Sequence, residues 1–392
     1  MKKLGLANTF VACYMGFFIQ AIVCGFAPLL FVIFNREYSI SLPLITLLST
    51  VNFVAQFATD GLAVFFVHRI GYRKSGIIAH LCAFLGLLLI GVVAPRVENI
   101  YVAIMSAVVL YSIGGGLLEV ILSPIIENVP TKNKSAEMSM LHSMFAVGSA
   151  ATILLTTFAL KLFGWQSWNK IALLWSVLPF LNMIYFMFIP INEASTEVKR
   201  VPVWTLFKDK VFLGFLLVMM CGGAAEIGIS QWASAFAESS LGISKAAGDV
   251  LGPCAFALMM AAARMLYSRV ARFVSLSNSM MYCGVFAAVC YLAAALVPIP
   301  FVALISCGLC GFAVGILWPG ALSLAAKAYP AAGGALFAVM ALAGDFGCTL
   351  GPTVVGFVAS MFGGELRAGL LAGALFPAVM VVGLFALKRK DK

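Results

Sequence analysis

Twelve long apolar runs constrain this chain more than any other feature of its sequence. Each run is about 20 residues or longer, which is the length a helix needs to cross the hydrocarbon core of a bilayer. The runs cover residues 4–34, 42–68, 75–95, 99–128, 136–161, 170–190, 211–237, 246–267, 275–297, 299–327, 331–361 and 366–387. Charged residues make up only 10% of the chain and hydrophobic residues 63%, which excludes a soluble globular protein. We therefore predict an all-α integral membrane protein with twelve transmembrane helices.

The basic residues are distributed unevenly between the two sides of the predicted membrane. If the N-terminus is cytoplasmic, eighteen of the 25 Lys and Arg residues fall on the cytoplasmic side and six on the opposite side. Such an excess inside is the positive-inside bias. It places both termini in the cytoplasm of a multi-pass plasma-membrane (cell inner membrane) protein. It also explains the net charge of +10 without a nucleic-acid partner.

One polar interval divides the twelve runs into two sets of six. We predict an N-terminal six-helix half at residues 1–190, a cytoplasmic linker at 191–210 and a C-terminal half at 211–392. The halves are similar to each other, because GGGLLEVILSP (114–124) aligns without a gap with LCGFAVGILWP (309–319). More weakly, Gly16 and Gln20 parallel Gly222 and Glu226. Duplicated six-helix halves are typical of membrane transporters.

Glu119 is the acid that most strongly indicates a function. It lies in an apolar run between three glycines and Pro124. An ionisable side chain inside a membrane is costly and marks a functional site by default, although a structural acid bonded to a neighbouring helix is the alternative. We predict that Glu119 couples transport to a proton, with His142 and Asp345 as weaker candidates. His142 could equally be a packing residue, and sodium could replace the proton.

A second group of polar and aromatic residues is predicted to bind a small polar solute. A pocket of this kind combines hydrogen-bonding side chains with flat apolar faces. The predicted substrate-binding residues are Glu226, Gln231, Trp232, Trp318, Gln20, Asn52 and Gln56. Steps of four place Asn52, Gln56 and Asp60 on one helical face. Trp232 has an alternative as part of the aromatic belt at the membrane interface.

A third group is predicted to act in gating. Asp60 is eight residues from His68, so it is placed nearer the cytoplasmic end of its helix than a mid-membrane residue would be. Glu127 and Glu137 flank two lysines, and Arg264 lies near the end of the eighth run. A solvated surface cluster is the alternative for Glu127 and Glu137, because exposed ion pairs contribute little.

The sequence argues against several other classes of site. Cys307 and Cys310 have C-x-x-C spacing, but no second pair or histidine accompanies them, so no metal site and no cofactor are expected. An enzyme would need a nucleophile with its base, or a set of metal ligands, and none can be assembled. We expect a monomer whose partners are a small solute, an ion and the lipid bilayer.

These features resemble the major facilitator superfamily, and within it the fucose:proton symporter branch. The resemblance rests on the glycine-rich sequence before Glu119 and Pro124, on Gly223 to Glu226 with Trp232 and Phe236, and on Trp318-Pro319 with Gly351-Pro352. It implies a twelve-helix fold and a proton-coupled symporter of a sugar or a similar small polar solute, working by alternating access. A proton-coupled exporter of drugs or metabolites is the alternative. The branch often has an aspartate in helix 1, where this chain has Gln20.

Overall fold

The computed structural model describes residues 5–192, 203–233, 236–237 and 250–390. Half of the predicted linker, residues 193–202, lies outside this part, as do parts of the predicted seventh and eighth runs and Lys2, Lys3 and Lys392. Twelve helices in the described part are long and apolar enough to cross a membrane, which confirms the predicted all-helical class.

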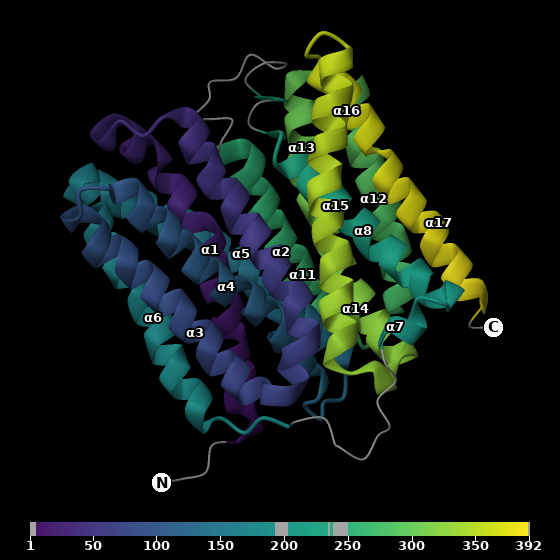
Figure 1. The fold of residues 1–392 in the computed structure, drawn as a ribbon. Helices are drawn as coiled ribbons and strands as arrows, with labels where there is room; N and C mark the ends of the chain where they lie inside the picture. The colour runs from purple at the N-terminus through teal and green to yellow at the C-terminus, as the bar shows by residue number, and fades with distance from the viewer. Residues whose placement is uncertain (1–4, 193–202, 234–235, 238–249, 391–392) are drawn as a thin grey trace. The chain divides into compact units, whose positions relative to one another are not determined.

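Seven of these helices are uninterrupted α-helices, and they carry most of the residues discussed below. They are α1 (Leu6–Tyr38), α2 (Leu42–Ile70), α4 (Ile100–Glu127), α5 (Lys134–Phe163), α8 (Lys210–Ser230), α12 (Leu276–Leu296) and α15 (Gly334–Met361). Figure 1 labels each of them along the chain. The ninth and tenth membrane helices are separate, because α12 ends at Leu296 and the next helix begins at Pro300.

The other membrane helices contain or adjoin irregular turns. They are α3 (Tyr72–Leu88) with a π-turn (Leu89–Val93) and a 3₁₀ turn (Ala94–Arg96), α6 (Trp168–Phe188) after a 3₁₀ turn (Trp165–Ser167), α11 (Ala255–Val270) after a π-turn (Val250–Cys254), α13 (Pro300–Val314) with α14 (Leu317–Ala328), and α16 (Leu366–Gly373) with α17 (Leu375–Lys390). The short α7 (Val203–Leu206) precedes α8, and a 3₁₀ turn (Pro330–Ala332) precedes α15.

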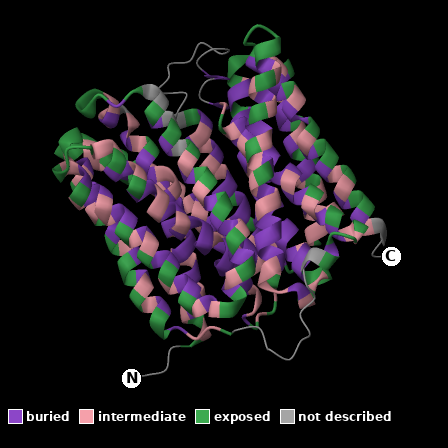
Figure 2. Ribbon diagram, in the orientation of Figure 1, coloured by how far each residue is buried: buried purple, intermediate pink, exposed green. Residues whose placement is uncertain are grey.

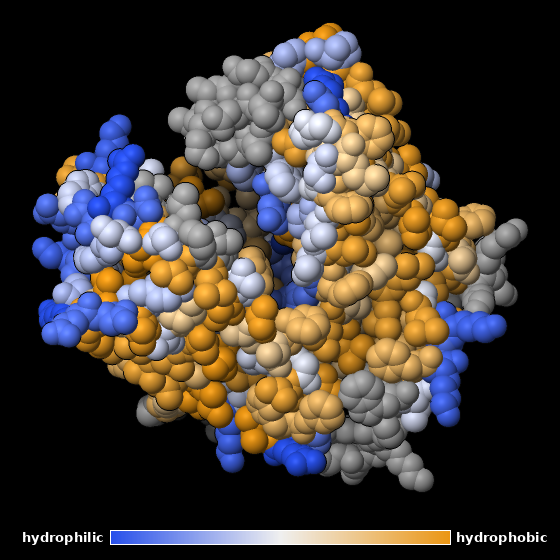
Figure 3. Space-filling view, turned by 45° about the horizontal axis from the view of Figure 1, so that its top comes forward, coloured by the Kyte–Doolittle hydropathy of each residue, from blue (hydrophilic) through white to orange (hydrophobic). Residues whose placement is uncertain are grey.

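The surface of the helices is that of a protein surrounded by lipid. Phe158, Leu174, Tyr282 and Phe301 are each between 63% and 75% exposed. So many large exposed apolar side chains would be unfavourable in water, but lipid tails accept them. Figure 2 shows exposed residues along the outer sides of the helices, and Figure 3 shows apolar side chains over much of the visible face.

The chain packs as two compact units. Unit 1 contains residues 1–130 and 144–195, and unit 2 contains residues 131–143 and 196–392. In unit 1, α3 packs against both α4 and α6, and α4 also packs against α1 and α2. In unit 2, α8 packs closely along α15, and α12 packs against α13 and α17. The boundary between the units lies inside α5, whose first turns belong to unit 2.

Glycines set the same close contacts in both units. A Cβ at Gly116 of α4 would lie 2.9 Å from the carbonyl oxygen of Gln56 on α2, and a Cβ at Gly311 of α13 would clash with the carbonyl oxygen of Phe256 on α11. Gly16 faces Leu122 in unit 1, and Gly222 faces Leu317 in unit 2. The sequence alignment pairs Gly116 with Gly311 and Leu122 with Leu317. The aligned residues therefore make equivalent contacts.

Outside the membrane spans, one polar contact fixes the start of α8. Asp209 caps the helix, because its Oδ1 accepts a hydrogen bond of 2.8 Å from the backbone N–H of Val211. Its Oδ2 accepts a hydrogen bond of 2.6 Å from the Tyr329 hydroxyl. Burial and the adjacent carboxylate raise the pKa of Tyr329, so its hydroxyl stays a neutral donor.

Candidate functional site

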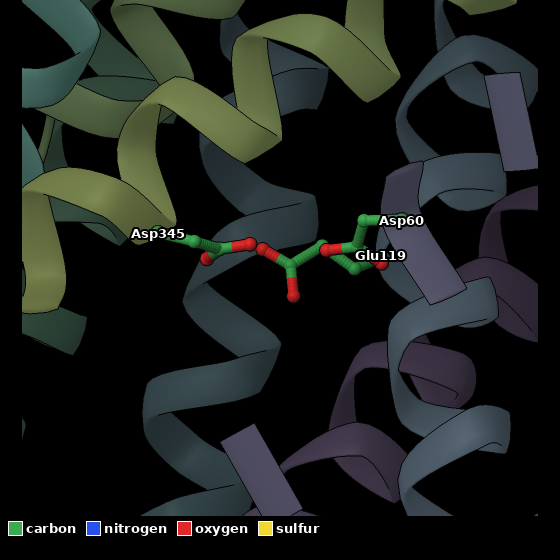
Figure 4. Close-up of side chains that lie close together, drawn as sticks. All are labelled: Asp60, Glu119 and Asp345. Atoms are coloured by element: carbon green, nitrogen blue, oxygen red, sulfur yellow. The ribbon is translucent and has the colours of Figure 1, made fainter. Parts of the chain in front are cut away.

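Two carboxylates lie together inside unit 1. One oxygen of Asp60 on α2 and one oxygen of Glu119 on α4 are within 4.8 Å of each other. Figure 4 shows the side chains of these two residues side by side. Asp60 is fully buried, whereas Glu119 is half-buried. The sequence assigned Asp60 to a gate nearer the helix end and Glu119 to ion coupling; the structure brings the two acids to one place.

Counting residues along one helix did not reveal this proximity, because depth along an axis says nothing about the neighbouring helix. The approach depends on Gly116, which lies one turn before Glu119 on α4. A Cβ at this position would lie 2.8 Å from Asp60 Oδ1 and 3.1 Å from the Cα of Gln56. Only a residue without a side chain lets α2 come close enough to place Asp60 beside Glu119.

Two buried glutamines surround the acid pair. Gln20 Nε2 on α1 donates a hydrogen bond of 2.6 Å to Glu119 Oε2. Gln20 is 3% exposed and Gln56 is 7% exposed. Among the described residues, Gln20 Oε1 and Gln56 Nε2 have no hydrogen-bond partner. A buried acceptor and a buried donor without partners are costly unless a ligand or water satisfies them. This arrangement suits a polar solute that both donates and accepts hydrogen bonds.

Asn52, the third predicted amide, is buried one turn from Gln56. Its Oδ1 accepts a hydrogen bond of 2.5 Å from the hydroxyl of Ser112 on α4. The helical spacing of seven places Ser112 on the same side of α4 as Glu119. Unit 1 therefore joins the predicted residues Gln20, Asn52 and Gln56 to the acid pair, all on α1, α2 and α4.

Unit 2 contains a buried ion pair between two predicted site residues. Arg264 Nη2 on α11 lies 3.3 Å from Glu226 Oε2 on α8, and the two side chains are 3% and 12% exposed. The sequence assigned Glu226 to substrate binding and Arg264 to gating. A guanidinium paired with a carboxylate avoids the cost of an isolated buried charge.

Backbone carbonyl groups hold the rest of the Arg264 guanidinium. Its Nε donates to the Gly315 carbonyl (2.7 Å) and its Nη1 donates to the His142 carbonyl (2.9 Å). Ser139 Oγ in turn donates to the carbonyl of Arg264 (2.8 Å). Arg264 thereby links α8, α11 and the first turns of α5 within unit 2.

The Gly315 carbonyl is available because the tenth membrane helix is broken. In an unbroken α-helix it would accept from the N–H of residue 319, but Pro319 has none. The chain makes a turn between α13, which ends at Val314, and α14, which begins at Leu317. The carbonyl end of a helix also carries partial negative charge, which favours a cation. The proline in the sequence thus creates the acceptor that Arg264 uses.

The aromatic residues predicted to contact substrate have contacts of their own. Trp232 Nε1 donates a hydrogen bond of 2.9 Å to the Pro352 carbonyl, and its ring lies against Gly356. Trp318 is 9% exposed and its ring lies against Gly344. Gln231 is exposed at the end of α8. The N–H of Trp232 is therefore engaged by the protein, and its ring is partly exposed.

The other predicted coupling and gating residues are divided between the two units. His142 is buried and belongs to unit 2, as do Asp345, half-buried on α15, and Glu137 in the first turn of α5. Glu127 is the last residue of α4 and is half-buried in unit 1. All ten cysteines are described and are free thiols.

Sequence reasoning missed several contributors to these clusters. Ser112 and Ser139 are ordinary serines in apolar helices, and the Gly315 contribution is a backbone atom. Ser323 on α14 is also buried, and its hydroxyl has no hydrogen-bond partner among the described residues. For Gly315 a signal was available, because Pro319 follows it by four residues. The serines carried no comparable signal.

Comparison with known proteins identifies the type of fold. The sequence profile described as Major Facilitator Superfamily matches residues 8–352. A search of curated proteins found no match. Among solved structures, FucP, a major facilitator transporter in the outward conformation, has a TM-score of 0.81 at 16% identity and covers 96% of this chain and 98% of its own.

Two further solved structures have the same fold, with similarly low sequence identity to this chain. A variant of the E. coli fucose:proton symporter FucP has a TM-score of 0.81 at 14% identity, covering 96% of this chain and 98% of that one. The proton:xylose symporter XylE, bound to 6-bromo-6-deoxy-D-glucose, has a TM-score of 0.80 at 10% identity, covering 97% of this chain and 95% of that one. At these identities the likeness establishes the fold and not the substrate.

Proposed function

Because this chain belongs to the major facilitator superfamily, and is therefore a membrane transporter, we propose that it is a proton-coupled symporter of a sugar or a similar small polar solute. It would work by alternating access, with substrate and proton moving together. The names of FucP and XylE as fucose:proton and proton:xylose symporters support this proposal by fold likeness. The residues of unit 1 give it a chemical basis.

The observation that carries the proposal is the pair of Asp60 and Glu119 in unit 1. Two carboxylates within 4.8 Å of each other repel when both are charged, and inside a membrane that repulsion is weakly screened. Binding one proton between them relieves it. The hydrogen bond from Gln20 to Glu119 fixes the carboxylate that would take and release that proton.

The amides beside the acid pair supply the substrate part of the proposal. Gln20 connects the two functions directly, because its Nε2 is bonded to Glu119 while its Oε1 still requires a donor. A hydroxyl of the solute would provide that donor, and Gln56 Nε2 would donate to a second oxygen. Solute binding would then depend on the same side chain that orients the proton-binding acid, which is what coupling requires.

The test separates transport from coupling in proteoliposomes. Glu119→Gln keeps the shape of the side chain and removes its ability to lose a proton. We expect it to retain exchange of labelled solute across the membrane but to lose accumulation driven by a pH gradient. Glu98→Gln, an exposed acid in the same unit, serves as the matched control and should behave like the wild type.

Three outcomes would overturn the proposal. Accumulation that survives Glu119→Gln in a pH gradient would remove Glu119 from coupling. Accumulation that follows a sodium gradient in the wild type, with no response to pH, would assign the site to sodium. Efflux of lipophilic cations, without uptake of any sugar, would favour a proton-coupled exporter of drugs or metabolites.

The proposal also includes a location and an orientation. The positive-inside distribution of Lys and Arg supports a plasma-membrane protein, in a bacterium the inner membrane, with both termini in the cytoplasm. It also supports a cytoplasmic linker at residues 191–210 between two six-helix halves. A cysteine introduced at Ser195 should react with an impermeant maleimide only after the cells are opened, and labelling of intact cells would reverse the orientation.

A further inference from the structure

The ion pair of unit 2 has a net charge of zero although one of its members is a predicted substrate contact. Glu226 and Arg264 are 12% and 3% exposed, and both lie in membrane spans. A carboxylate alone in such a site would attract cationic ligands, because Coulomb interactions are strong where the dielectric constant is low. Arg264 removes that attraction at a distance of 3.3 Å.

Arg264 is held so firmly that it stays beside Glu226. Three of its nitrogens bond three different partners, two of them backbone carbonyl oxygens at 2.7 Å and 2.9 Å. Backbone carbonyl oxygens do not titrate and are held in place by the main chain. The positive charge of Arg264 is therefore kept beside the acid.

Glu226 keeps an acceptor for a ligand despite the pairing. Arg264 engages its Oε2, and in the described part of the chain Oε1 makes no hydrogen bond. An ionised carboxylate is a strong acceptor for a hydroxyl group. With its charge compensated, it can accept from an uncharged solute without also selecting for a cation.

We propose that Arg264 is the residue that restricts this site to uncharged solutes, by compensating the charge of the substrate contact Glu226. This inference rests on the proposed function, because it takes Glu226 as a substrate contact. It adds the class of substrate: neutral polyhydroxylated molecules, with amines and acids both excluded. Arg264 is then a determinant of specificity rather than a gate.

The experiment sets the net charge of the pair to three values and measures which ligand each variant binds most tightly. Arg264→Gln leaves a charge of −1, Glu226→Gln leaves +1, and the double variant restores zero. The probes are D-glucosamine below pH 7 as the cation, D-glucose as the neutral solute and D-glucuronate as the anion. Binding is measured on the purified full chain in detergent as ligand-dependent thermal stabilisation.

We expect the ligand preference to follow the charge of the pair. Arg264→Gln should raise the affinity for glucosamine relative to glucose about tenfold. Glu226→Gln should raise the affinity for glucuronate relative to glucose by a similar factor. In both cases one uncompensated unit charge in a partly buried site attracts the oppositely charged ligand by at least this factor in affinity. The double variant should return to the wild-type preference. Arg264→Lys, which keeps the charge and loses the three-point bonding, should also keep it.

A purely structural role for Arg264 would lower stability without changing the order of the three probes. That result would overturn the inference. A wild type that binds glucosamine or tetraphenylphosphonium more tightly than glucose would also overturn it. So would a ligand preference that does not change with the charge of the pair in any variant. If Arg264→Gln does not fold, Glu226→Gln and the double variant still decide. Failure of proton coupling would be seen separately, in the Glu119→Gln uptake assay.

Discussion

The two aligned membrane helices, α4 in unit 1 and α13 with α14 in unit 2, handle buried charge in different ways. In α4 the acid Glu119 lies beside a second acid and accepts from the neutral amide of Gln20. At the equivalent place in unit 2 the helix is broken after Val314, and the freed Gly315 carbonyl accepts from the permanently charged Arg264. Gln20 and Glu226, which the sequence also paired, are each bonded to the polar centre of their own unit.

This difference fits the functions that we propose for the two halves, which are coupling in unit 1 and solute recognition in unit 2. An acid held by an amide and another acid can change its charge by taking a proton, so unit 1 is suited to coupling. The acid of unit 2 is instead paired with a guanidinium, which does not lose its proton in proteins. This pairing fits the recognition of a solute that we propose for unit 2.

Removing half of the ion pair should give the largest loss of stability. Arg264→Gln leaves Glu226 as an uncompensated buried charge, and breaking such a pair costs about 3–5 kcal/mol. The double variant with Glu226→Gln should recover much of that loss, because no charge then remains. The measurement is thermal or chemical unfolding of all three variants in detergent, analysed as a double-mutant cycle. Additive effects would mean that the two side chains do not interact.

The glycines that correspond in the two units should differ in what they affect. Gly116→Ala should cost about 1–3 kcal/mol of stability, because the added Cβ would lie 2.8 Å from Asp60 Oδ1. It should also weaken pH-driven uptake by moving Asp60 away from Glu119. Gly311→Ala should cost stability through its clash with Phe256, yet retain pH dependence in the folded fraction.

Gly61→Ala on α2 is the control for that comparison, since a Cβ there has no neighbour within 4 Å. It should leave both stability and uptake unchanged. If Gly116→Ala alters uptake no more than Gly311→Ala does, the acid pair of unit 1 does not depend on the approach of α2 to α4.

The smallest expected effect is the difference in stability between alanine variants of the two aligned prolines. Pro124→Ala and Pro319→Ala each restore a backbone N–H to a helix, which favours folding. In unit 2 the restored N–H would compete with Arg264 for the Gly315 carbonyl, so we expect Pro319→Ala to stabilise less than Pro124→Ala by about 1 kcal/mol. Unfolding midpoints of the two variants check this. Equal gains would show that Arg264 does not need the freed carbonyl.

The amino-acid sequence was sufficient for the number of membrane helices, because each apolar run is long enough to span a bilayer without help from its neighbours. It was also sufficient for the repeat, since Gly116 with Gly311 and Leu122 with Leu317 are local patterns that recur. Glu119 and Glu226 could be selected as candidates from the sequence alone, because an acid inside an apolar run is conspicuous wherever the run packs.

Only the tertiary structure decided which of these residues lie together. Asp60 looked like an acid near a helix end until the packing of α2 on Gly116 placed it beside Glu119. The sequence predicted Arg264 as a gating residue but not its partners, which are Glu226 and the carbonyl groups of His142 and Gly315. The physical reason is that the length of an apolar run is a local property of one segment of the sequence. The partner of a buried charge depends instead on contacts between segments that are far apart in the chain.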